Sequence, residues 1–437
     1  MKKTLLTLIT LIAVTTVSAQ KYVGGDISLL TKYETNGAKY YDLDGNAITD
    51  MLDFFKQQGM NAMRVRLFVD PTKSGDIAAC QDLPYIKALG KRIKEAGFSL
   101  MLDFHYSDTW ADPKKQWTPD NWKNLSDDEL ATKLYNYTKE CLTQMVAAGA
   151  TPDFIQTGNE ISYGMLWGTK EAVGSNNTNR CYTDSPAANW TRFFNLLKKT
   201  GQACREVCKK AKIILHSERA GKPNVLTDYF DRMKSNDIDY DIIGLSYYPY
   251  YHGDLATLET ALNTLESKNY GKDIMIVEAG YYYAWQPAKK SDTNPDGIEF
   301  DYSGTYPITP IGQQAFTKAL ISMLNKHEQV KGLYWWWMEA CENGLDWSTK
   351  RVSDKWYNAS LFNDSNTSEV GYPAGKAMPA IAELKNFIGD PSGIETINRE
   401  PLTVNQHAWY TLDGRKLNGA PNQKGIYIHN GKKMVVR

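Results

Sequence analysis

The fold is decided by two short apolar runs that each end in a glutamate, Asp153-Phe154-Ile155-Gln156-Thr157-Gly158-Asn159-Glu160 and Asp273-Ile274-Met275-Ile276-Val277-Glu278. Each run has the length and composition of a buried β-strand. In barrels of parallel strands, functional side chains gather at the carboxyl ends of the strands. The two glutamates are far apart in the sequence, so only a closed fold could bring them together.

Working outward from these runs, short apolar runs alternate with longer amphipathic segments eight times. Residues 126–148, for example, have apolar residues at helical spacing. Such alternation predicts a parallel sheet with helical crossovers, and eight units predict one (β/α)₈ TIM barrel. The alternative is an open doubly wound sheet, but no Gly-rich phosphate loop follows the first strand. The predicted strands are 22–28, 60–67, 98–104, 153–159, 212–216, 240–248, 273–278 and 330–337.

The connections between these segments are unequal in length. Those from helix to strand are short, whereas four from strand to helix are long: 105–125, 161–186, 279–309 and 338–372. Long loops at the carboxyl ends of barrel strands are where such folds build their sites. These loops are rich in polar and aromatic side chains, and the last predicted strand ends in three consecutive tryptophans, 335–337.

The charge and the aromatic content of the chain limit the classes of molecule that it is expected to bind. The 437 residues carry 50 basic and 50 acidic side chains, and this balance argues against nucleic acids and anionic membranes as partners, since both need a basic face. Its 12 Trp, 27 Tyr and 13 Phe include many in predicted loops. A large core explains part of this content, and exposed aromatic rings in a neutral protein suit the faces of sugars.

Residues 1–19 have the pattern of a secretory signal peptide. Lys2 and Lys3 precede an apolar stretch too short to span a membrane, and Val17-Ser18-Ala19 offers a small-residue cleavage site. We therefore expect an exported, soluble protein, which we take to be a monomer. The six cysteines show no C-x-x-C spacing, and buried free thiols are the simplest interpretation.

The sequence changes character after Pro391. Residues 400–437 contain repeated turn dipeptides such as Asp413-Gly414 and Asn430-Gly431, with short β-prone runs between them. The predicted organisation is a signal peptide (1–19), a catalytic barrel (20–390) and a linker with a small β module (391–437).

Several stretches resemble glycoside hydrolase family 53, the arabinogalactan endo-β-1,4-galactanases, within a clan of retaining (β/α)₈ glycosidases. The resemblance covers roughly residues 22–385, and its most specific part is His105-Tyr106-Ser107-Asp108-Thr109-Trp110-Ala111-Asp112-Pro113. The tail is similar to C-terminal sorting modules of exported Gram-negative enzymes. The other matching stretches are Gly24-Gly25-Asp26-Ile27-Ser28, Arg64-Val65-Arg66-Leu67-Phe68-Val69-Asp70-Pro71, Gly158-Asn159-Glu160, Ser246-Tyr247-Tyr248-Pro249 and Val277-Glu278.

The resemblance implies roles for five of these residues. Glu160 would be the acid/base and Glu278 the nucleophile of a retaining mechanism. Asn159 would hydrogen-bond the 2-hydroxyl of the sugar, Arg66 would neutralise and orient the nucleophile, and Tyr248 would donate to it. Arg66 would thereby keep Glu278 ionised, while Glu160 titrates at higher pH and serves both steps.

Further substrate contacts are implied for His105, Asp108 and Trp110, and for Trp336 at the end of the last strand. The family usually has Glu directly after that Trp, whereas here Trp337 follows.

Some members of the family hold calcium between the loops after the seventh and eighth strands. Here Asp292, Asn294 and Asp296 alternate and precede Gly297, as oxygen ligands do in loops that bind hard cations. We expect Ca²⁺ as the one candidate cofactor and no organic cofactor, and the alternative is an ordinary polar turn.

Three functions thus compete. The first is an exported endo-β-1,4-galactanase acting on pectic galactan. The second is another endo-glycanase of the clan, a mannanase or glucanase, which the stretch 105–113 argues against. The third is a non-catalytic barrel that captures glycans, although such proteins typically lose one carboxylate and both are present here.

Overall fold

The computed structural model describes residues 20–170, 179–295, 297–341, 358–363 and 374–389, with 409–411, 416–417, 419–421, 424–429 and 432–436 of the C-terminal segment. The chain divides into two compact units, Met1–Gly389 and Asp390–Arg437.

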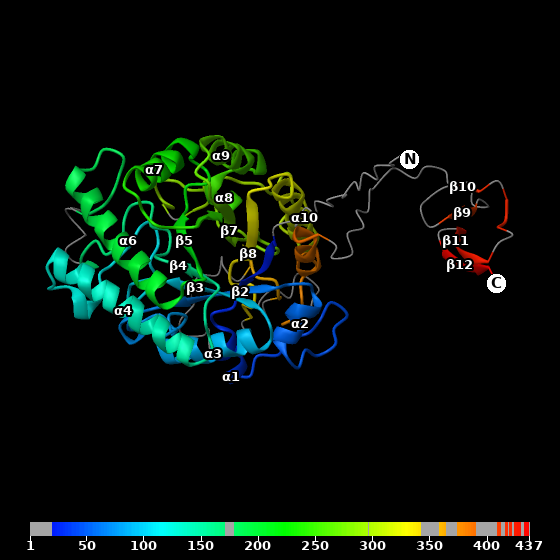
Figure 1. Ribbon diagram of the computed structural model, residues 1–437, viewed down its shortest axis with the longest axis horizontal. Coiled ribbons are helices and arrows are strands. Elements are labelled where there is room, and N and C mark those ends of the chain that lie inside the picture. The colour runs from blue at the N-terminus through cyan, green and yellow to red at the C-terminus, as the bar shows by residue number, and fades with distance from the viewer. Residues whose placement is uncertain are drawn as a thin grey trace, which may run out of the picture. The chain divides into compact units, whose positions relative to one another are not determined.

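Eight parallel strands close into a barrel in the first unit (Figure 1). Strands adjacent in the chain are adjacent in the barrel, and β8 pairs with β1 to complete the ring. The predicted (β/α)₈ TIM barrel is therefore confirmed. The strands are β1 (Tyr22–Asp26), β2 (Ala62–Leu67), β3 (Ser99–Phe104), β4 (Phe154–Gln156), β5 (Lys212–Ser217), β6 (Ile242–Tyr247), β7 (Asp273–Ala279) and β8 (Val330–Trp335).

Helices surround these strands on the outside of the barrel (Figure 1). The longer helices each bury apolar side chains on one face. They are α1 (Leu30–Thr35), α2 (Met51–Gln57), α3 (Leu83–Glu95), α4 (Asp127–Ala147), α6 (Ala187–Val207), α7 (Pro223–Ser235), α8 (Pro249–His252), α9 (Leu255–Lys268) and α10 (Pro310–Leu324), with 3₁₀ turns η1 (Pro71–Lys73), η2 (Asp120–Trp122) and η5 (Pro379–Phe387).

The helix predicted at 126–148 is confirmed as α4, and its start has a local cause. The Ser126 side chain accepts from the backbone of Glu129, whose carboxylate accepts in return from the backbone of Ser126. This reciprocal capping satisfies two backbone donors that a helix start otherwise leaves open.

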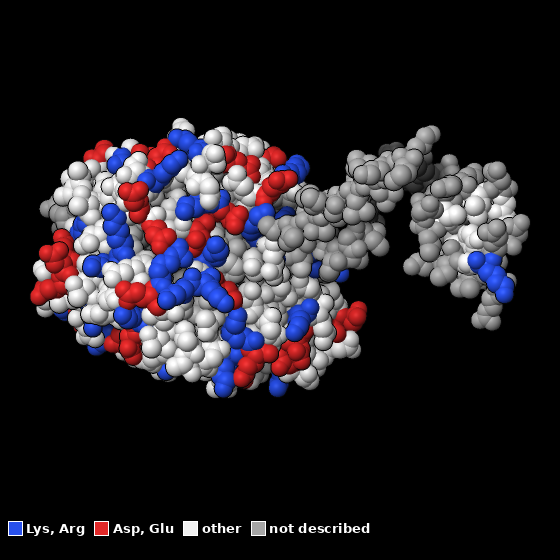
Figure 2. Space-filling view, in the orientation of Figure 1, with Lys and Arg blue, Asp and Glu red and all other residues white. Residues whose placement is uncertain are grey.

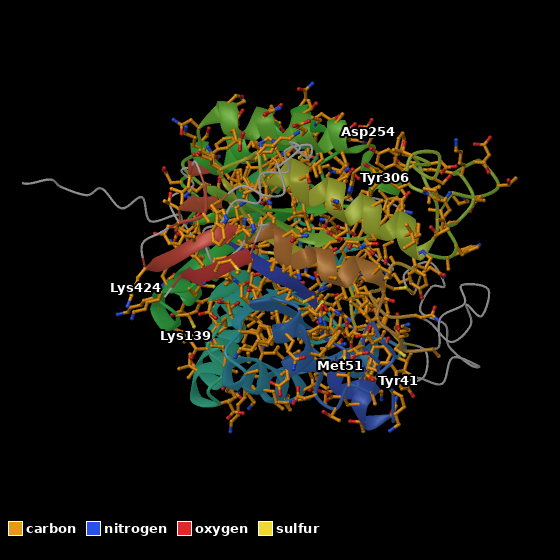
Figure 3. All side chains as sticks on the ribbon, turned by 90° about the vertical axis from the view of Figure 1, so that its right-hand side faces the viewer. Tyr41, Met51, Lys139, Asp254, Tyr306 and Lys424 are labelled. Carbon is orange, nitrogen blue, oxygen red and sulfur yellow. The ribbon has the colours of Figure 1, made fainter. Side chains whose placement is uncertain are left out.

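Side chains are densely packed among the strands and helices (Figure 3), and two clusters of buried apolar residues form the core. Within the barrel, the layer toward the amino ends of the strands is a closed apolar cluster. The polar side chains inside the barrel therefore lie toward the carboxyl ends of the strands. The buried members are Ala62, Met101, Phe154, Ile214, Ile242, Met275, Val277 and Tyr334.

Two strands, β4 and β8, end earlier than predicted at their carboxyl ends, where the candidate site residues lie. β4 stops at Gln156, so Glu160 follows the strand instead of closing it, and the chain turns through Gly158 (φ 114°) and Glu160 (φ 51°). β8 stops at Trp335, and Trp337 has φ 49°. The backbone there no longer alternates, so these side chains are aimed by turns and not by the strand pleat.

A register shift in β6 also shapes the site. The pairing with β7 shifts between Leu245 and Ser246, which sets Ser246 directly opposite Glu278. Bulges of this kind re-aim side chains at barrel rims.

The second unit contains a four-stranded antiparallel sheet in the order β10-β9-β11-β12. The rings of Trp409 and His429 stack across it with centroids 4.3 Å apart. Its strands are β9 (Trp409–Thr411), β10 (Lys416–Leu417), β11 (Gly425–His429) and β12 (Lys432–Val436).

On the face shown in Figure 2, basic and acidic side chains of the barrel are intermixed. This agrees with the balanced composition. Among the described residues, no helix is long and apolar enough to cross a membrane. The six cysteines are free thiols, and all but Cys80 are buried.

Candidate active site

The two glutamates singled out in the sequence meet at the carboxyl ends of the barrel strands. The link is the hydroxyl of Ser246, which donates to Glu160 Oε1 at 2.7 Å and lies 3.4 Å from Glu278 Oε2. One side chain of β6 therefore contacts a carboxylate from the loop after β4 and another from β7.

Glu278 lies among groups that favour its ionised form. Arg64 Nη2 is 2.9 Å from Oε1, and the Tyr248 hydroxyl donates to Oε2 at 2.8 Å. Burial nevertheless raises the pKa of Glu278 to about 7, against the opposing effects of Arg64 and Tyr248. The predicted donation from Tyr248 is confirmed.

Among the described residues, no lysine or arginine pairs with Glu160 as Arg64 pairs with Glu278. Burial raises its pKa well above the usual value, and the charges of Glu278 and then Glu218 raise it further. The side chain stays partly exposed, so water reaches it and moderates the effect of burial. Of the two carboxyls, Glu160 is the one that keeps its proton near neutral pH.

The imidazole of His216 holds the loop that carries Glu160. Burial lowers the pKa of His216 well below its usual value, so the ring is neutral. The backbone N–H of Glu160 (3.2 Å) and the Gln156 amide (2.9 Å) both donate to Nδ1. The ring proton therefore sits on Nε2, which donates to Ser246 Oγ at 2.8 Å.

Arg64 is the centre of the charged network beneath Glu278. Its Nη1 contacts Asp26 at 2.9 Å, and its Nη2 contacts Asp103 at 2.7 Å and Asn159 Oδ1 at 3.0 Å. The guanidinium is fully buried, so every one of these contacts acts in a low-dielectric environment.

The contact that we predicted between Arg66 and Glu278 is wrong, because Arg64 takes that place. Both arginines point into the barrel from β2, but Arg66 lies one pleat nearer the strand end. It forms an ion pair with Asp26 at 2.7 Å, and among the described residues its Nε and Nη2 have no hydrogen-bond partner.

Arg66 instead faces three indole rings. Its guanidinium carbon lies 4.6 Å from the centroid of Trp110, 5.1 Å from Trp336 and 5.7 Å from Trp337. Trp110 is fixed by donation from its ring to Asp76 at 2.8 Å. Trp110 is partly exposed and Trp336 is 8% exposed, so these two rings are the surface of this cluster. We call Arg66, Trp110, Trp336 and Trp337 the arginine–indole cluster.

Two other residues predicted to bind substrate have structural partners. Asp108 accepts from the backbone N–H of Asp70 at 3.0 Å and of Asp120 at 2.8 Å, so both its oxygens hold loops together. His105 Nε2 lies 3.1 Å from Asp103, and its Nδ1 accepts from Ala111 N at 3.0 Å.

Asn159, which we expect to bind the sugar 2-hydroxyl, shares Arg64 Nη2 with Glu278. Its Oδ1 accepts from Arg64 and its Nδ2 donates to the carbonyl of Ala111 at 2.8 Å. The amide is thereby fixed in orientation between β2 and the third loop.

Sequence reasoning missed several members of the site, namely Asp26, Arg64, Asp103, His216, Glu218 and Ser246. A usable signal was present for Asp103 and His216, since each is an ionisable residue inside an otherwise apolar strand. Such residues are rarely buried without partners. Ser246 and Glu218 carried no comparable signal.

The predicted calcium loop is only partly described, because Asp296 lies outside the described residues. Asp292 is exposed, and the Asn294 amide donates to the carbonyls of Ala288 and Lys289 at 3.2 Å each. These bonds leave Asn294 Oδ1 as its ligand atom. Among the described residues, no group of three His, Cys, Asp or Glu side chains is arranged to hold a metal.

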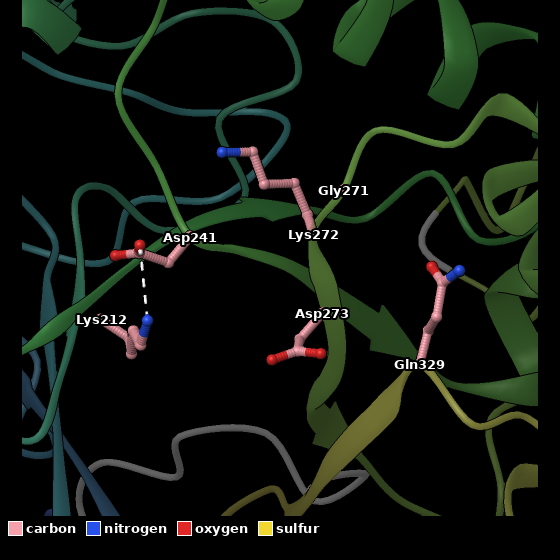
Figure 4. A pocket seen from close by; sticks show the side chains of 6 residues that line it. All are labelled: Lys212, Asp241, Gly271, Lys272, Asp273 and Gln329. Carbon is pink, nitrogen blue, oxygen red and sulfur yellow. Dashed lines mark ion pairs between the residues drawn. The ribbon is translucent and has the colours of Figure 1, made fainter. Parts of the chain in front are cut away.

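A separate hollow of about 340 Å³ lies at the opposite, amino ends of β5 to β8 (Figure 4). Two of its charged residues are paired with each other: Lys212 is 3.8 Å from Asp241, which also pairs with Arg205 at 2.8 Å. This end of a barrel serves stability and not chemistry. The lining residues are Lys212, Asp241, Gly271, Lys272, Asp273 and Gln329.

Comparison with known proteins agrees with this geometry. The model of the family described as Glycosyl hydrolase family 53 matches residues 22–371. An arabinogalactan endo-β-1,4-galactanase of Cellvibrio japonicus is 31% identical over 81% of this chain and 89% of its own length. An endo-β-1,4-galactanase of Bacillus subtilis is 30% identical over 72% of this chain and 68% of its own.

Among solved structures, the family 53 catalytic domain of Ignisphaera aggregans covers 85% of this chain and 97% of its own, with 31% identity and a TM-score of 0.70. The family match spans all eight barrel strands and both glutamates, and the fold agrees with it. The chain therefore belongs to glycosyl hydrolase family 53.

Proposed function

We propose that the protein is an exported endo-β-1,4-galactanase that hydrolyses the β-1,4-galactan of pectic arabinogalactan with retention of configuration. Membership of the family and the activities named for its relatives from Cellvibrio japonicus and Bacillus subtilis support the substrate. The arrangement of Glu160, Ser246 and Glu278 supports the chemistry.

One observation carries the mechanism. The Ser246 hydroxyl is 2.7 Å from one carboxylate and 3.4 Å from the other. The sum of the two distances is the largest possible separation between these two carboxyl oxygens. It is below the roughly 6.5 Å at which the carboxyl separations of inverting enzymes begin, and it suits the about 5–5.5 Å of retaining enzymes. An inverting enzyme needs room for a water molecule between carboxyl and sugar.

The two carboxyls then divide the reaction. Glu160 gives its proton to the glycosidic oxygen while Glu278 attacks C1, so the C1–O bond breaks and a glycosyl ester forms. Esterification removes the charge of Glu278, and the pKa of Glu160 falls because that charge had raised it. Glu160 can then take a proton from the attacking water, which displaces Glu278 and regenerates both groups.

Arg64 and Tyr248 hold Glu278 ready for attack. The ion pair and the phenolic donor favour its carboxylate form and fix its orientation. Charge-assisted contacts of this kind are the stronger class of hydrogen bond.

Export rests on the sequence of residues 1–19, which lie outside the described residues. A charged start, a short apolar stretch and a small-residue cleavage site are typical of a secretory signal. A polymer such as pectic galactan is met outside the cell, which agrees with this proposal.

Product analysis tests the proposed function. The purified protein is incubated with galactan, mannan and cellulose, and the first anomer released is followed by NMR. We expect internal cleavage of galactan alone, with the β-anomer formed first. Comparable cleavage of mannan or cellulose would contradict the substrate, and initial α-anomer would contradict retention. Binding without cleavage would favour a glycan-capturing barrel.

A further inference from the structure

A row of two tyrosine side chains, with an arginine at each end, lies beside the loop of Glu160. The guanidinium carbon of Arg219 is 3.9 Å from the centroid of the Tyr163 ring, and this ring is 4.7 Å from that of Tyr182. Arg180 Nη1 donates to the Tyr182 hydroxyl at 2.8 Å. Tyr163 is partly exposed and Tyr182 is 36% exposed. We call these four residues the Tyr163 row.

The row is attached to the ends of β4 and β5 through buried polar contacts. Ser162, next to Tyr163, donates to Glu218 Oε2 at 2.6 Å, and Glu218 Oε1 pairs with Arg219 Nη2 at 2.7 Å. Ser162 also contacts Ser217 Oγ at 3.0 Å. Such a network fixes the Tyr163 ring before any ligand arrives, which lowers the entropic cost of binding.

One buried donor of the row lacks a hydrogen-bond partner in the part of the chain that the structure describes. Arg219 is 9% exposed, and among the described residues its Nε makes no hydrogen bond. Buried donors are normally satisfied, so an exception calls for a specific partner such as a ligand or a water molecule. A loop that only packed against the barrel would not require it.

The position of the Tyr163 row places it on one side of the glycosidic bond that is cleaved, the side of the departing sugar. It follows β4 and β5, whereas Arg64 and Asp103 lie on β2 and β3, across β4 in the order of the barrel. Glu218, joined to the row, is close enough for its charge to raise the pKa of Glu160. Since Glu160 hands its proton to the departing oxygen, the sugar on that oxygen lies next to the loop of Glu160.

We propose that the Tyr163 row binds the galactose unit on the leaving-group side of the cleaved bond. This deepens the proposed function and rests on it. The axial 4-hydroxyl of galactose leaves one ring face lined with C–H groups, which suits contact with the tyrosine rings. The nearby arginines supply donors for its hydroxyls, in the usual pattern of an apolar surface with a few polar groups.

The test separates the leaving sugar from the chemistry. β-Galactobiosyl fluoride forms the same glycosyl-enzyme without a leaving sugar, and added galactobiose then competes with water for it. In the full-length Tyr163→Ala protein, the ratio of transfer to hydrolysis should fall about tenfold, the size expected for one lost ring contact. Consumption of the fluoride without acceptor should change less than twofold.

Two variants serve as controls. Tyr163→Phe keeps the ring and should keep most of the transfer. Tyr135→Ala removes a tyrosine from the outer helix α4, where its hydroxyl contacts Glu206 at 2.6 Å, and should behave as wild type. If Tyr163→Ala folds poorly, Tyr182→Ala removes the more exposed ring and should lower the transfer ratio in the same direction.

The outcomes are distinct. An unchanged transfer ratio in both alanine variants would overturn the assignment, and so would an equal loss on fluoride alone, which would indicate damage to the catalytic pair. A wild-type protein that cleaves no galactan would instead overturn the proposed function.

Discussion

At the scale of single residues, Arg64 and Arg66 show why two neighbours of one type cannot be told apart from sequence. They are two positions apart on β2 and share a face, so periodicity assigns both to the inside of the barrel. Which one meets Glu278 depends on depth along the strand, and that depends on the register of all eight strands. The identity of the two glutamates, by contrast, could be predicted from local sequence.

The same substitution at both positions should have different effects. Arg64→Lys replaces a fork that reaches Asp26, Asp103, Asn159 and Glu278 with a single ammonium, and we expect kcat to fall about 10²–10³-fold. Arg66→Lys disturbs the arginine–indole cluster, and we expect a KM for galactan raised about tenfold with little change in kcat. Steady-state kinetics with a melting curve for each variant measures this, and a larger kcat loss in Arg66→Lys would contradict it.

Tyr248 provides a prediction about pH. Its hydroxyl favours the ionised form of Glu278 and so opposes the effect of burial. With both effects present, the pKa of Glu278 is about 7. In the proposed mechanism only ionised Glu278 can attack, so activity should be lost as pH falls through this pKa. Tyr248→Phe should raise the pKa and move the acidic limb of kcat/KM to higher pH.

The neighbouring Tyr247→Phe is the matched control for this profile. Its hydroxyl donates to Gly253 at 3.0 Å, away from the carboxyl pair, and its removal should leave the acidic limb in place. A limb that stays fixed in Tyr248→Phe, or moves to lower pH, would mean that the phenol does not tune Glu278.

At the scale of elements, the strands and helices were predictable and the turns at their ends were not. The alternation of apolar runs and amphipathic segments reflects burial, which sequence reports directly. The positive φ angles of Glu160 and Trp337 occur beside contacts with residues distant in the sequence: the Glu160 N–H donates to His216, and the N–H that follows Trp337 donates to the Asp26 carbonyl. Non-glycine residues in that region are strained and persist only where surrounding contacts impose them, as they do at functional sites.

The loop at Asp292–Gly297 carries the prediction of calcium binding at this scale. If Asp292, Asn294 and Asp296 hold the ion in the native state only, excess chelator should lower the melting temperature, and added Ca²⁺ should restore it. Asp292→Asn should weaken this response, whereas Asp44→Asn in an exposed loop elsewhere should not. An unchanged melting curve, with no metal found by elemental analysis, would leave the loop as a polar turn.

At the scale of the whole molecule, the barrel ends with η5. Within this segment Ile381, Leu384 and Phe387 are fully buried, and the compact unit closes at Gly389. The change of composition near Pro391 could be read from sequence, because it alters local character. The role of η5 could not, since a short 3₁₀ segment has little periodicity of its own.

Two truncations should therefore differ. A chain ending at Gly389 should keep its melting temperature and its turnover of galactan. A chain ending at Met378 loses Ala380 and three large buried apolar side chains, each of the three worth about 1.5–3 kcal/mol, and should be strongly destabilised. Circular dichroism melts and galactan assays compare them. Loss of folding in the longer chain would mean that the tail completes the barrel.

The assignment of Glu160 as acid/base and Glu278 as nucleophile is tested most directly by azide rescue. In Glu278→Ala no glycosyl-enzyme can form, so azide should attack from the opposite face and give the inverted α-galactosyl azide. In Glu160→Ala the intermediate forms from an activated aryl glycoside, and azide, which needs no base, should give the retained β-azide. NMR of the two azide products gives their configurations. A β-azide from Glu278→Ala together with an α-azide from Glu160→Ala would reverse the two roles. Turnover near that of wild type in either variant would remove that glutamate from the catalytic pair.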